Sequence, residues 1–291
     1  MDVVIGPQIE KLISKALEED IGPGDLTTLS TVAADAWGTG LFRAKRECVV
    51  AGLFLLERIF SLLDGAVKVH SLCRDGERAE RGTVVAEAEG PVRALLMGER
   101  TALNFLQRLS GTATLTRQYV EAVKGFPCKV IDTRKTTPGL RTLEKYAVRM
   151  GGGTNHRLGL YDAALIKDNH IAAAGSIRLA VETVRRHAPF MARVEVECSD
   201  LEQVREAIEA RAEVIMLDNM GTKEMAEAVK VINKRAWVEA SGGITMERLR
   251  EVAEAGVDFI SVGALTHSAP AVDFNMKIAS PTTKKEIGFK S

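Results

Sequence analysis

The chain has 291 residues, which is enough for two domains or for one barrel with an appendage. Lys plus Arg and Asp plus Glu both number 39, so the formal net charge is zero and the pI is about 7.0. This balance argues against a nucleic acid or a membrane surface as a partner, because both favour an excess of basic residues. A local basic cluster in a neutral chain instead suits a small anionic ligand.

The four cysteines lie far apart and form no CxxC pair, which argues against a zinc site or a disulfide framework. We expect them to be buried, reduced thiols. The first residues lack a basic stretch followed by an apolar run, so no signal peptide is expected. No segment approaches the roughly 18 apolar residues that a spanning helix needs. Together these features predict a cytoplasmic protein.

The first third of the chain mixes helical and strand patterns without a repeating unit. Helices are predicted at 7–19 and 52–63, and strands at 37–50 and 83–89. A longer helical pattern follows at 97–124. Gly111 is predicted to break or kink it, because an interior Gly costs about 1 kcal/mol relative to Ala. The mixture predicts an α+β N-terminal domain.

After Cys128, short apolar runs alternate with amphipathic helices. The runs are 129–132, 164–168, 193–197, 214–218, 236–240 and 259–262. Four of the helices begin at residues that favour the N-cap position, namely Ser176, Asp200, Thr222 and Thr245. The repeated strand and helix pairs predict right-handed βαβ units on a parallel sheet, which is either a barrel or an open doubly wound sheet.

Each predicted strand ends in polar residues or in glycine. Examples are Asp132, Lys167, Glu197, Asp218 and the Ser241-Gly242-Gly243 run. In an α/β barrel the carboxyl ends of all strands converge on the face that carries the active site, whereas an open sheet gathers its ligands near one switch point. Six strand ends of this kind therefore favour a barrel.

The stretch from Asp132 to His170 concentrates cationic side chains around three consecutive glycines, Gly151 to Gly153. These side chains are Arg134, Lys135, Arg141, His156, Arg157 and Lys167. The arginines Arg134 and Arg157 offer rigid forks that suit carboxylates, and His156 adds a ring donor. A lone histidine is more often structural, but His156 lies in a stretch too polar for a core. The stretch predicts an anion-binding site.

Glu197 and Asp218 end neighbouring predicted strands on the same face. A carboxylate pair of this kind suits Mg²⁺ beside a substrate phosphate, or stabilises a developing cation. The structural alternative is that both acids only pair with Lys135 and Lys167. The two readings are compatible, because lysines that neutralise the acids in the empty site can turn to pyrophosphate when the acids hold Mg²⁺.

Two glycine loops follow late strands, at Ser241 to Gly243 and at Gly263-Ala264. Free backbone N–H groups at such loops bind phosphate, and barrels often carry a phosphate site after their late strands. One such loop alone is more often an ordinary tight turn, but two in series favour a phosphate site. The candidate residues together predict a substrate pair with planar and tetrahedral anionic groups, such as a dicarboxylic acid and a sugar phosphate.

Eight motifs, in order along nearly the whole chain, resemble those of the quinolinate phosphoribosyltransferase family. They are EDIGPGDLTT (19–28), ERTALNFLQRLSGTAT (99–114), DTRKTTPGLR (132–141), GGGTNHRLGLYDAALIKDNH (151–170), VEVECSDLEQ (194–203), IMLDN (215–219), EASGGIT (239–245) and GVDFISVGALTHSAPAVDF (256–274). The resemblance implies an α/β protein with two domains. An N-terminal α+β sandwich at 1–115 dimerises and caps, an incomplete, open α/β barrel at 116–275 is catalytic, and 276–291 form a C-terminal segment. No motif matches after Ile278, so the tail is expected to be flexible.

The resemblance also assigns roles to individual residues. Family members are dimers or larger, and Arg100 matches an arginine that reaches into the site of a neighbouring subunit. Quinolinate contacts are implied for Arg134, His156 and Arg157, with Lys167 nearby. The catalytic residues implied are Lys135, Glu197 and Asp218, which meet phosphoribosyl pyrophosphate and its Mg²⁺, with Glu197 and Asp218 as metal ligands, directly or through water. The remaining substrate-binding positions are Thr133, Ser241, Gly242, Gly243, Val262, Gly263 and Ala264.

The implied reaction transfers a phosphoribosyl group from phosphoribosyl pyrophosphate to quinolinate with loss of CO₂. It yields nicotinate mononucleotide for NAD biosynthesis, and no organic cofactor is expected. One alternative is a relative of the same fold that uses another pyridine acid, such as nicotinate; cations for two carboxylates favour quinolinate. A second alternative is a barrel that binds a phosphorylated ligand without turnover, against which the charged residues Arg134, Lys135, Glu197 and Asp218 argue.

Overall fold

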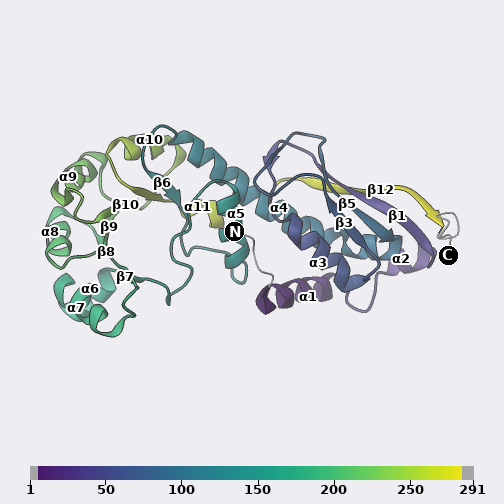
Figure 1. The fold of residues 1–291 in the computed structure, drawn as a ribbon, viewed down its shortest axis with the longest axis horizontal. Coiled ribbons are helices and arrows are strands. Elements are labelled where there is room, and N and C mark those ends of the chain that lie inside the picture. The colour runs from purple at the N-terminus through teal and green to yellow at the C-terminus, as the bar shows by residue number, and fades with distance from the viewer. Residues whose placement is uncertain (1–5, 284–291) are drawn as a thin grey trace. The chain divides into compact units, whose positions relative to one another are not determined.

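The computed structural model describes residues 6–283, which form two compact units (Figure 1). The first unit contains the chain up to Leu115, the short segment Arg149–Gly151 and the chain from Ala269 onward. The second unit contains Thr116–Val148 and Gly152–Ser268. Among residues 6–283, the helices are all too short or too polar to cross a membrane.

The first unit is built on a four-stranded antiparallel sheet with the strand order β12-β1-β5-β3. These strands are β1 (Ala36–Ala44), β3 (Lys68–Ser71), β5 (Val84–Pro91) and β12 (Phe274–Thr283). A separate two-stranded ladder joins β2 (Cys48–Val49) to β4 (Arg78–Ala79). The strands predicted at 37–50 and 83–89 are confirmed, and the sheet supports the predicted α+β character.

Strand β12 pairs with β1, so segments from opposite ends of the chain lie side by side in one sheet. The pairing runs from Ala44 opposite Phe274 to Ala36 opposite Thr283. The sequence predicted a flexible tail after Ile278, and this is wrong for residues 279–283, because they continue the ladder with β1. The rest of the predicted tail, residues 284–291, lies outside the described residues.

Helices complete the first unit. They are α1 (Pro7–Ile21), α2 (Leu26–Thr31), α3 (Leu53–Leu63) and the first part of α4 (Val92–Ala122). The helical spacing at 7–19 is confirmed, since Ile9, Ile13 and Leu17 form the buried face of α1. Helix α2 begins at Asp25, whose carboxylate accepts a hydrogen bond from the backbone N–H of Thr28 at 2.9 Å.

Gly111 does not break α4, which is helical from Val92 to Ala122. The reason for glycine is space. A Cβ atom at this position would lie 2.3 Å from the carbonyl oxygen of Pro270 and 3.1 Å from Cα of Ala271. The missing side chain lets the backbone of 270–271 pass close to the helix, which explains the helix-unfavourable residue.

Gly111→Ala should therefore destabilise the protein by about 2 kcal/mol or more, because backbone atoms cannot move away as a flexible side chain could. Urea unfolding would measure the loss. Gly65→Ala is the matched control, since nothing lies within 4 Å of its added Cβ. Equal stability of the two variants would contradict the packing explanation.

The second unit is an open α/β barrel of six parallel strands in the order β6-β11-β10-β9-β8-β7. The strands are β6 (Lys129–Ile131), β7 (Ala164–Ile166), β8 (Val194–Cys198), β9 (Val214–Asp218), β10 (Trp237–Ser241) and β11 (Phe259–Ser261). Among the described residues no ladder joins the edge strands β6 and β7, so the barrel does not close. The predicted incomplete barrel is confirmed.

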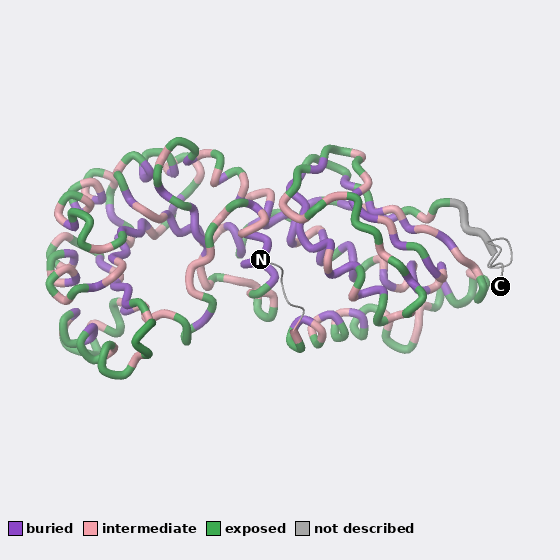
Figure 2. Tube along the Cα trace, viewed as in Figure 1, coloured by how far each residue is buried: buried purple, intermediate pink, exposed green. Residues whose placement is uncertain are grey.

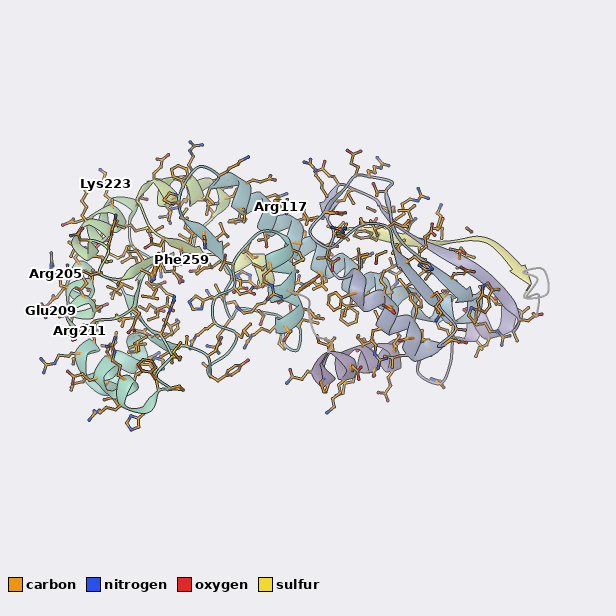
Figure 3. The ribbon with its side chains drawn as sticks, in the orientation of Figure 1. Arg117, Arg205, Glu209, Arg211, Lys223 and Phe259 are labelled. Carbon is orange, nitrogen blue, oxygen red and sulfur yellow. The ribbon has the colours of Figure 1, made fainter. Side chains whose placement is uncertain are left out.

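Helices flank the strands in chain order. They are the rest of α4, α5 (Arg141–Met150, whose last two residues belong to the first unit), α6 (Asp168–Ala174), α7 (Ile177–His187), α8 (Leu201–Glu209), α9 (Thr222–Ile232), α10 (Met246–Glu254) and α11 (Ala264–His267). Figure 1 shows α7 to α10 on the outer side of the strands, and Figure 2 shows that the strands are buried while the outer helix faces are exposed. Arg205 and Lys223 project from these outer faces (Figure 3).

Two predicted helix caps are confirmed and two need correction. Ser176 accepts a hydrogen bond from Leu179 N at 3.1 Å, and Asp200 accepts one from Gln203 N at 2.8 Å. Thr222 is the first residue of α9 rather than its N-cap, which is Gly221. Thr245 occupies the N-cap of α10 without a capping hydrogen bond. For α9, residue type therefore placed the N-cap one position too late.

Candidate active site

A cavity of about 500 Å³ opens at the carboxyl ends of the barrel strands. Its predicted site residues are Thr133, Arg134, Lys135, His156, Arg157, Lys167, Glu197, Asp218, Ser241, Gly242 and Gly243. Four predicted residues, Arg100, Val262, Gly263 and Ala264, do not line it. The barrel therefore brings together most of the residues singled out from sequence, from segments spread over more than a hundred positions.

Strand alternation explains which side chains reach the cavity. On a strand, alternate residues point to the same face. Glu195 and Glu197 on β8, Met216 and Asp218 on β9, and Glu239 and Ser241 on β10 occupy such alternate positions. The register places Glu197 and Glu239 on either side of Met216, and Asp218 beside Ser241.

Arg134 and Arg157 each contain a buried Nε atom without a hydrogen-bond partner among the described residues. Arg157 uses one terminal nitrogen to donate to the carbonyl of Ala163 at 3.1 Å. Burial, followed by the nearby charge of Arg134, lowers the pKa of Arg157 from its ordinary value. Buried polar donors are normally satisfied, so these two atoms mark positions where a ligand acceptor fits.

His156 projects into the cavity wall between two acids that the sequence analysis did not single out. Its Nε2 lies 2.9 Å from Glu195 Oε2 and 3.4 Å from Glu239 Oε2. Burial lowers the pKa of His156, but the hydrogen bonds and charges of Glu195 and Glu239 outweigh it and raise this pKa to about 10. The ring is therefore cationic at neutral pH and adds a third positive charge beside the two arginines.

The backbone of His156 is held by a buried ion pair between Asp132 and Lys145, whose side chains are 0% and 1% exposed. Asp132 accepts the His156 N–H at 2.9 Å and the side-chain amide of Asn155 at 2.6 Å. Lys145 donates to the His156 carbonyl at 3.0 Å. Burial raises the pKa of Asp132, opposed by Lys145 and these hydrogen bonds. The polar end of β6 thus orients the loop of the candidate carboxylate site rather than the ligand itself.

Lys167 and Glu197 form an ion pair at 2.6 Å, as the structural alternative for these residues predicted. Glu197 is only 15% exposed, whereas Lys167 is 45% exposed and reaches the open part of the cavity. Asp218 accepts a hydrogen bond from the side-chain amide of Asn219 at 2.7 Å. Neither carboxylate is buried among apolar groups, so both remain available to a cation.

Lys135 lies on a loop, and both its backbone N–H and its carbonyl form hydrogen bonds to side chains. Its N–H donates to Thr133 Oγ1 at 3.0 Å, and its carbonyl accepts from Thr266 Oγ1 at 2.8 Å. A Cβ atom at Gly263 would lie 3.0 Å from Cδ of Lys135, so Gly263 lies against this side chain although it does not line the cavity. The loop presents an exposed ammonium beside the last glycine turn.

The predicted phosphate loops differ in their geometry. Gly242 has φ 89°, and a Cβ there would lie 2.3 Å from Asn219 Oδ1, so only glycine fits this turn. Gly243 has φ 56° and open space around it. By contrast, Val262 is buried and its N–H donates to Ile131 at 3.0 Å, within the sheet. The Ser241 to Gly243 turn has the free backbone expected of an anion site, and Val262 does not.

Two features of the basic stretch have structural roles. Arg141 donates to Thr136 Oγ1 at 3.0 Å and to the carbonyls of Arg134 and Leu158, both at 3.3 Å, so it braces the loops instead of lining the cavity. The triple glycine packs against helices: a Cβ at Gly153 would lie 2.8 Å from side-chain atoms of Thr116 and Val148. The absence of a side chain at Gly153 therefore serves packing within the protein.

Sequence reasoning missed Lys145, Asn155, Glu195 and Glu239. The signal for the two glutamates was present, since each lies two positions before a recognised site residue on the same strand. No local pattern marks Lys145, which lies in an amphipathic helix where a lysine is ordinarily exposed. One group of possible metal ligands, His156 with Glu195 and Glu239, is joined by a hydrogen bond of 2.9 Å between His156 Nε2 and Glu195 Oε2.

Comparisons with known proteins agree with this geometry. Residues 25–110 match the N-terminal domain of quinolinate phosphoribosyl transferase, and residues 112–277 match its C-terminal domain. A probable carboxylating nicotinate-nucleotide pyrophosphorylase of Synechocystis sp. is 49% identical over 93% of this chain and 92% of its own length. The protein of the same name from Bacillus subtilis is 48% identical over 93% of each chain.

A solved structure gives the same result. NadC from Streptococcus pyogenes superposes with a TM-score of 0.92 at 43% identity, covering 97% of this chain and 99% of that one. The fold and the cavity define an open-barrel phosphoribosyltransferase. The chain belongs to the quinolinate phosphoribosyltransferase family.

Proposed function

We propose that this protein transfers the phosphoribosyl group of phosphoribosyl pyrophosphate to quinolinate and releases pyrophosphate and CO₂. The observation that carries the proposal is the cluster of three cationic groups at one wall of the cavity. Arg134 and Arg157 each offer a buried Nε without a partner among the described residues, and the contacts of His156 with two acids favour its cationic form. Three cations suit a planar dicarboxylate, because charge-assisted hydrogen bonds to carboxylates are strong and directional.

Other residues that line the cavity suit the sugar phosphate. We assign Lys135 and the Ser241 to Gly243 turn to the phosphate groups, since an exposed ammonium and free backbone N–H groups bind such oxygens. Lys167, which pairs with Glu197 in the structure, exchanges this partner for a substrate anion when substrate is present. Thr133 contributes by holding the Lys135 backbone.

The acids Glu197 and Asp218 fit a magnesium ion. Both are carboxylates on adjacent strands at the cavity wall, and oxygen ligands of this kind, directly or through water, are those that Mg²⁺ takes beside substrate phosphates. A bound Mg²⁺ would neutralise charge on the pyrophosphate. The proposed reaction needs no organic cofactor, because the substrate ring itself stabilises the electron pair that remains when CO₂ leaves.

The proposed chemistry has two steps. The pyridine nitrogen forms a bond to C1 of the ribose while the bond from C1 to the pyrophosphate oxygen breaks, and Lys135 stabilises the leaving oxygens. Glu197 or Asp218 offsets the positive charge that develops on the sugar. The ring nitrogen is then cationic, so when the bond to the adjacent carboxylate breaks, the electron pair stays on the ring carbon and the neighbouring positive charge stabilises it. That carbon takes a proton as CO₂ leaves, and Arg134, His156 and Arg157 keep the other carboxylate bound.

Steady-state assays with quinolinate and with nicotinate, following pyrophosphate release in the presence of Mg²⁺, test the substrate. Quinolinate should give much the higher kcat/KM, since nicotinate leaves cationic groups of the cavity without a carboxylate. A clear preference for nicotinate would overturn the choice of acid. No pyrophosphate with either acid would overturn the assignment as a transferase.

Asp218→Asn tests the assignment of the phosphate side. The variant should raise the KM for phosphoribosyl pyrophosphate or the Mg²⁺ requirement about 10- to 100-fold, because an amide binds the ion more weakly than a carboxylate. Asp35→Asn, at an exposed position of the first unit, is the matched control. An effect confined to quinolinate affinity would contradict the assignment.

We further propose a homodimer or larger assembly in which Arg100 reaches the cavity of a second subunit. Arg100 is exposed on α4 in the first unit and does not line the cavity of its own chain. Exposure alone does not indicate a function, because most exposed arginines are only solvated. The proposal for Arg100 therefore rests on the family resemblance. The domain that carries it would serve as a cap for the neighbour.

Mixing two inactive proteins tests this shared site. Arg100→Ala and Arg134→Ala should each lose most activity, and the mixture should recover up to about a quarter of the original activity, because about half of its dimers are hybrids and each hybrid has one intact site of two. Subunit exchange would be verified by mass spectrometry of differently labelled chains. A mixture that exchanges subunits but stays inactive would contradict the shared site.

The proposal includes a cytoplasmic location. All four cysteines are free thiols, and three of them are buried, which suits a reducing compartment. Burial raises the pKa of Cys48 and Cys73 to about 11, so neither is a reactive thiolate at neutral pH. No cysteine takes part in the proposed chemistry.

A further inference from the structure

Two buried glutamates lie behind the His156 ring and have no role in the reaction as described above. Glu195 of β8 and Glu239 of β10 are 4% and 2% exposed. Their Oε2 atoms lie 2.9 Å and 3.4 Å from the same ring nitrogen, Nε2. Buried acids are costly unless they are paired, and this imidazole is the hydrogen-bond partner that the two carboxylates share; their Oε1 atoms are buried without a partner among the described residues.

The second ring nitrogen, Nδ1, points elsewhere. It has no hydrogen-bond partner within residues 6–283, and it is not among the buried side-chain atoms that lack one. His156 lines the cavity, so Nδ1 is open to whatever occupies it. The ring therefore bridges the buried acids on one side and the ligand space on the other.

The protonation state of the His156 ring decides whether Nδ1 can donate a hydrogen bond. A neutral imidazole has one N–H, and if that proton is donated from Nε2 to the glutamates, Nδ1 carries only a lone pair. Such a lone pair would repel a substrate carboxylate. A protonated ring donates from both nitrogens, and two acids at Nε2 favour this form.

We infer that Glu195 and Glu239 are positioning residues that hold His156 so that its Nδ1–H donates to a carboxylate of the substrate. The inference rests on the proposed function, since it takes quinolinate as the source of that carboxylate. It adds a second role for β8 and β10, whose next inward residues, Glu197 and Ser241, serve the sugar phosphate side.

Other charged groups near His156 also affect its environment. Asp132 and Lys145 hold its backbone as a neutral pair, and Arg157, the next residue, interacts with the charges of Arg134 and Glu195. Burial, with a contribution from the Glu195 charge, raises the pKa of Glu239. The shorter contact makes Glu195 the main partner, and Glu239 supports it.

The first test measures the pKa of His156 in the free protein by NMR titration. The chain has five histidines, so a His156→Gln protein identifies the signal. The variants are Glu195→Gln, Glu239→Gln and the double, with Glu227→Gln on the exposed face of α9 as the control. These changes keep side-chain shape and remove one charge each.

The expected result is a pKa well above about 6.5 in the parent and the control, and one below about 6.5 in the double variant. Glu195→Gln should lower it more than Glu239→Gln. A parent His156 that titrates at its ordinary value, or a double variant that leaves the pKa unchanged, would overturn the inference. The single variants give the same comparison if the double does not fold.

The second test measures KM against pH. At pH 8 the double variant should raise the KM for quinolinate roughly ten- to a hundredfold, with the KM for phosphoribosyl pyrophosphate unchanged. The deficit should shrink at pH 6, where the ring regains its proton. A deficit that is the same at both pH values would show a merely structural role and overturn the inference. Failure of the proposed function is distinguishable, because the parent would then not turn over quinolinate even if the NMR result stood.

Discussion

Replacement of Arg134 by methionine is expected to lower kcat/KM for quinolinate about 100-fold or more. Methionine keeps much of the arginine stem but removes the charge and the fork. Nε of Arg134 is buried without a protein partner, so its hydrogen bond is available to a substrate carboxylate. Removing one member of a buried, hydrogen-bonded charge pair costs about 2–5 kcal/mol, and each 1.4 kcal/mol is about tenfold.

The loss should appear mainly in the KM for quinolinate, while the KM for phosphoribosyl pyrophosphate changes little. Arg205→Met provides the control, because this arginine projects from the exposed face of α8 (Figure 3). Thermal unfolding of both variants would verify that the fold is intact. A loss that falls on phosphoribosyl pyrophosphate instead would reverse the assignment of the two halves of the cavity.

Replacement of Lys145 by methionine is expected to lower the free energy of unfolding by about 3–5 kcal/mol, because it leaves the buried Asp132 carboxylate without its counter-ion. It also removes the donor to the His156 carbonyl, so quinolinate binding should weaken as well. Urea unfolding measures the first effect and steady-state kinetics the second. Lys223→Met on α9 is the exposed control.

The stability deficit of the Lys145 variant should depend on pH. Burial already raises the pKa of Asp132 in the intact protein, and loss of the lysine raises it further. A group whose folded pKa lies above its unfolded value favours folding below the unfolded pKa, and this contribution is lost as pH rises through the folded pKa. The deficit should therefore shrink on acidification from pH 8 toward pH 5. A deficit that grows over this range would contradict an unpaired carboxylate as its cause.

The barrel could be predicted from sequence because its signals are local. Apolar runs, helix caps and polar strand ends recur in the same order along the chain, and Ser176 and Asp200 make the capping bonds that their positions predict. The role of Gly111 within α4 could not be judged in the same way, because the reason for glycine is the distant backbone at Pro270. Strand β12 escaped prediction for a similar reason, since its partner β1 lies at the other end of the chain.

Site residues at the ends of strands were predicted from the sequence, whereas those inside strands were missed. Glu197 and Asp218 end strands and were identified, whereas Glu195 and Glu239 lie inside strands that read as apolar. Arg141 has the same residue type and neighbourhood as Arg134, and only the fold shows that it braces loops. Residues that come into contact only through the fold show no characteristic spacing along the sequence.

The most direct measurement uses quinolinate labelled at the 2-carboxylate, with phosphoribosyl pyrophosphate and Mg²⁺, and follows labelled CO₂ and pyrophosphate together. The proposed reaction releases both in equal amounts, and the Arg134→Met protein should slow both equally. Release of pyrophosphate without labelled CO₂, or no release of either product, would contradict phosphoribosyl transfer with decarboxylation as the function of this cavity.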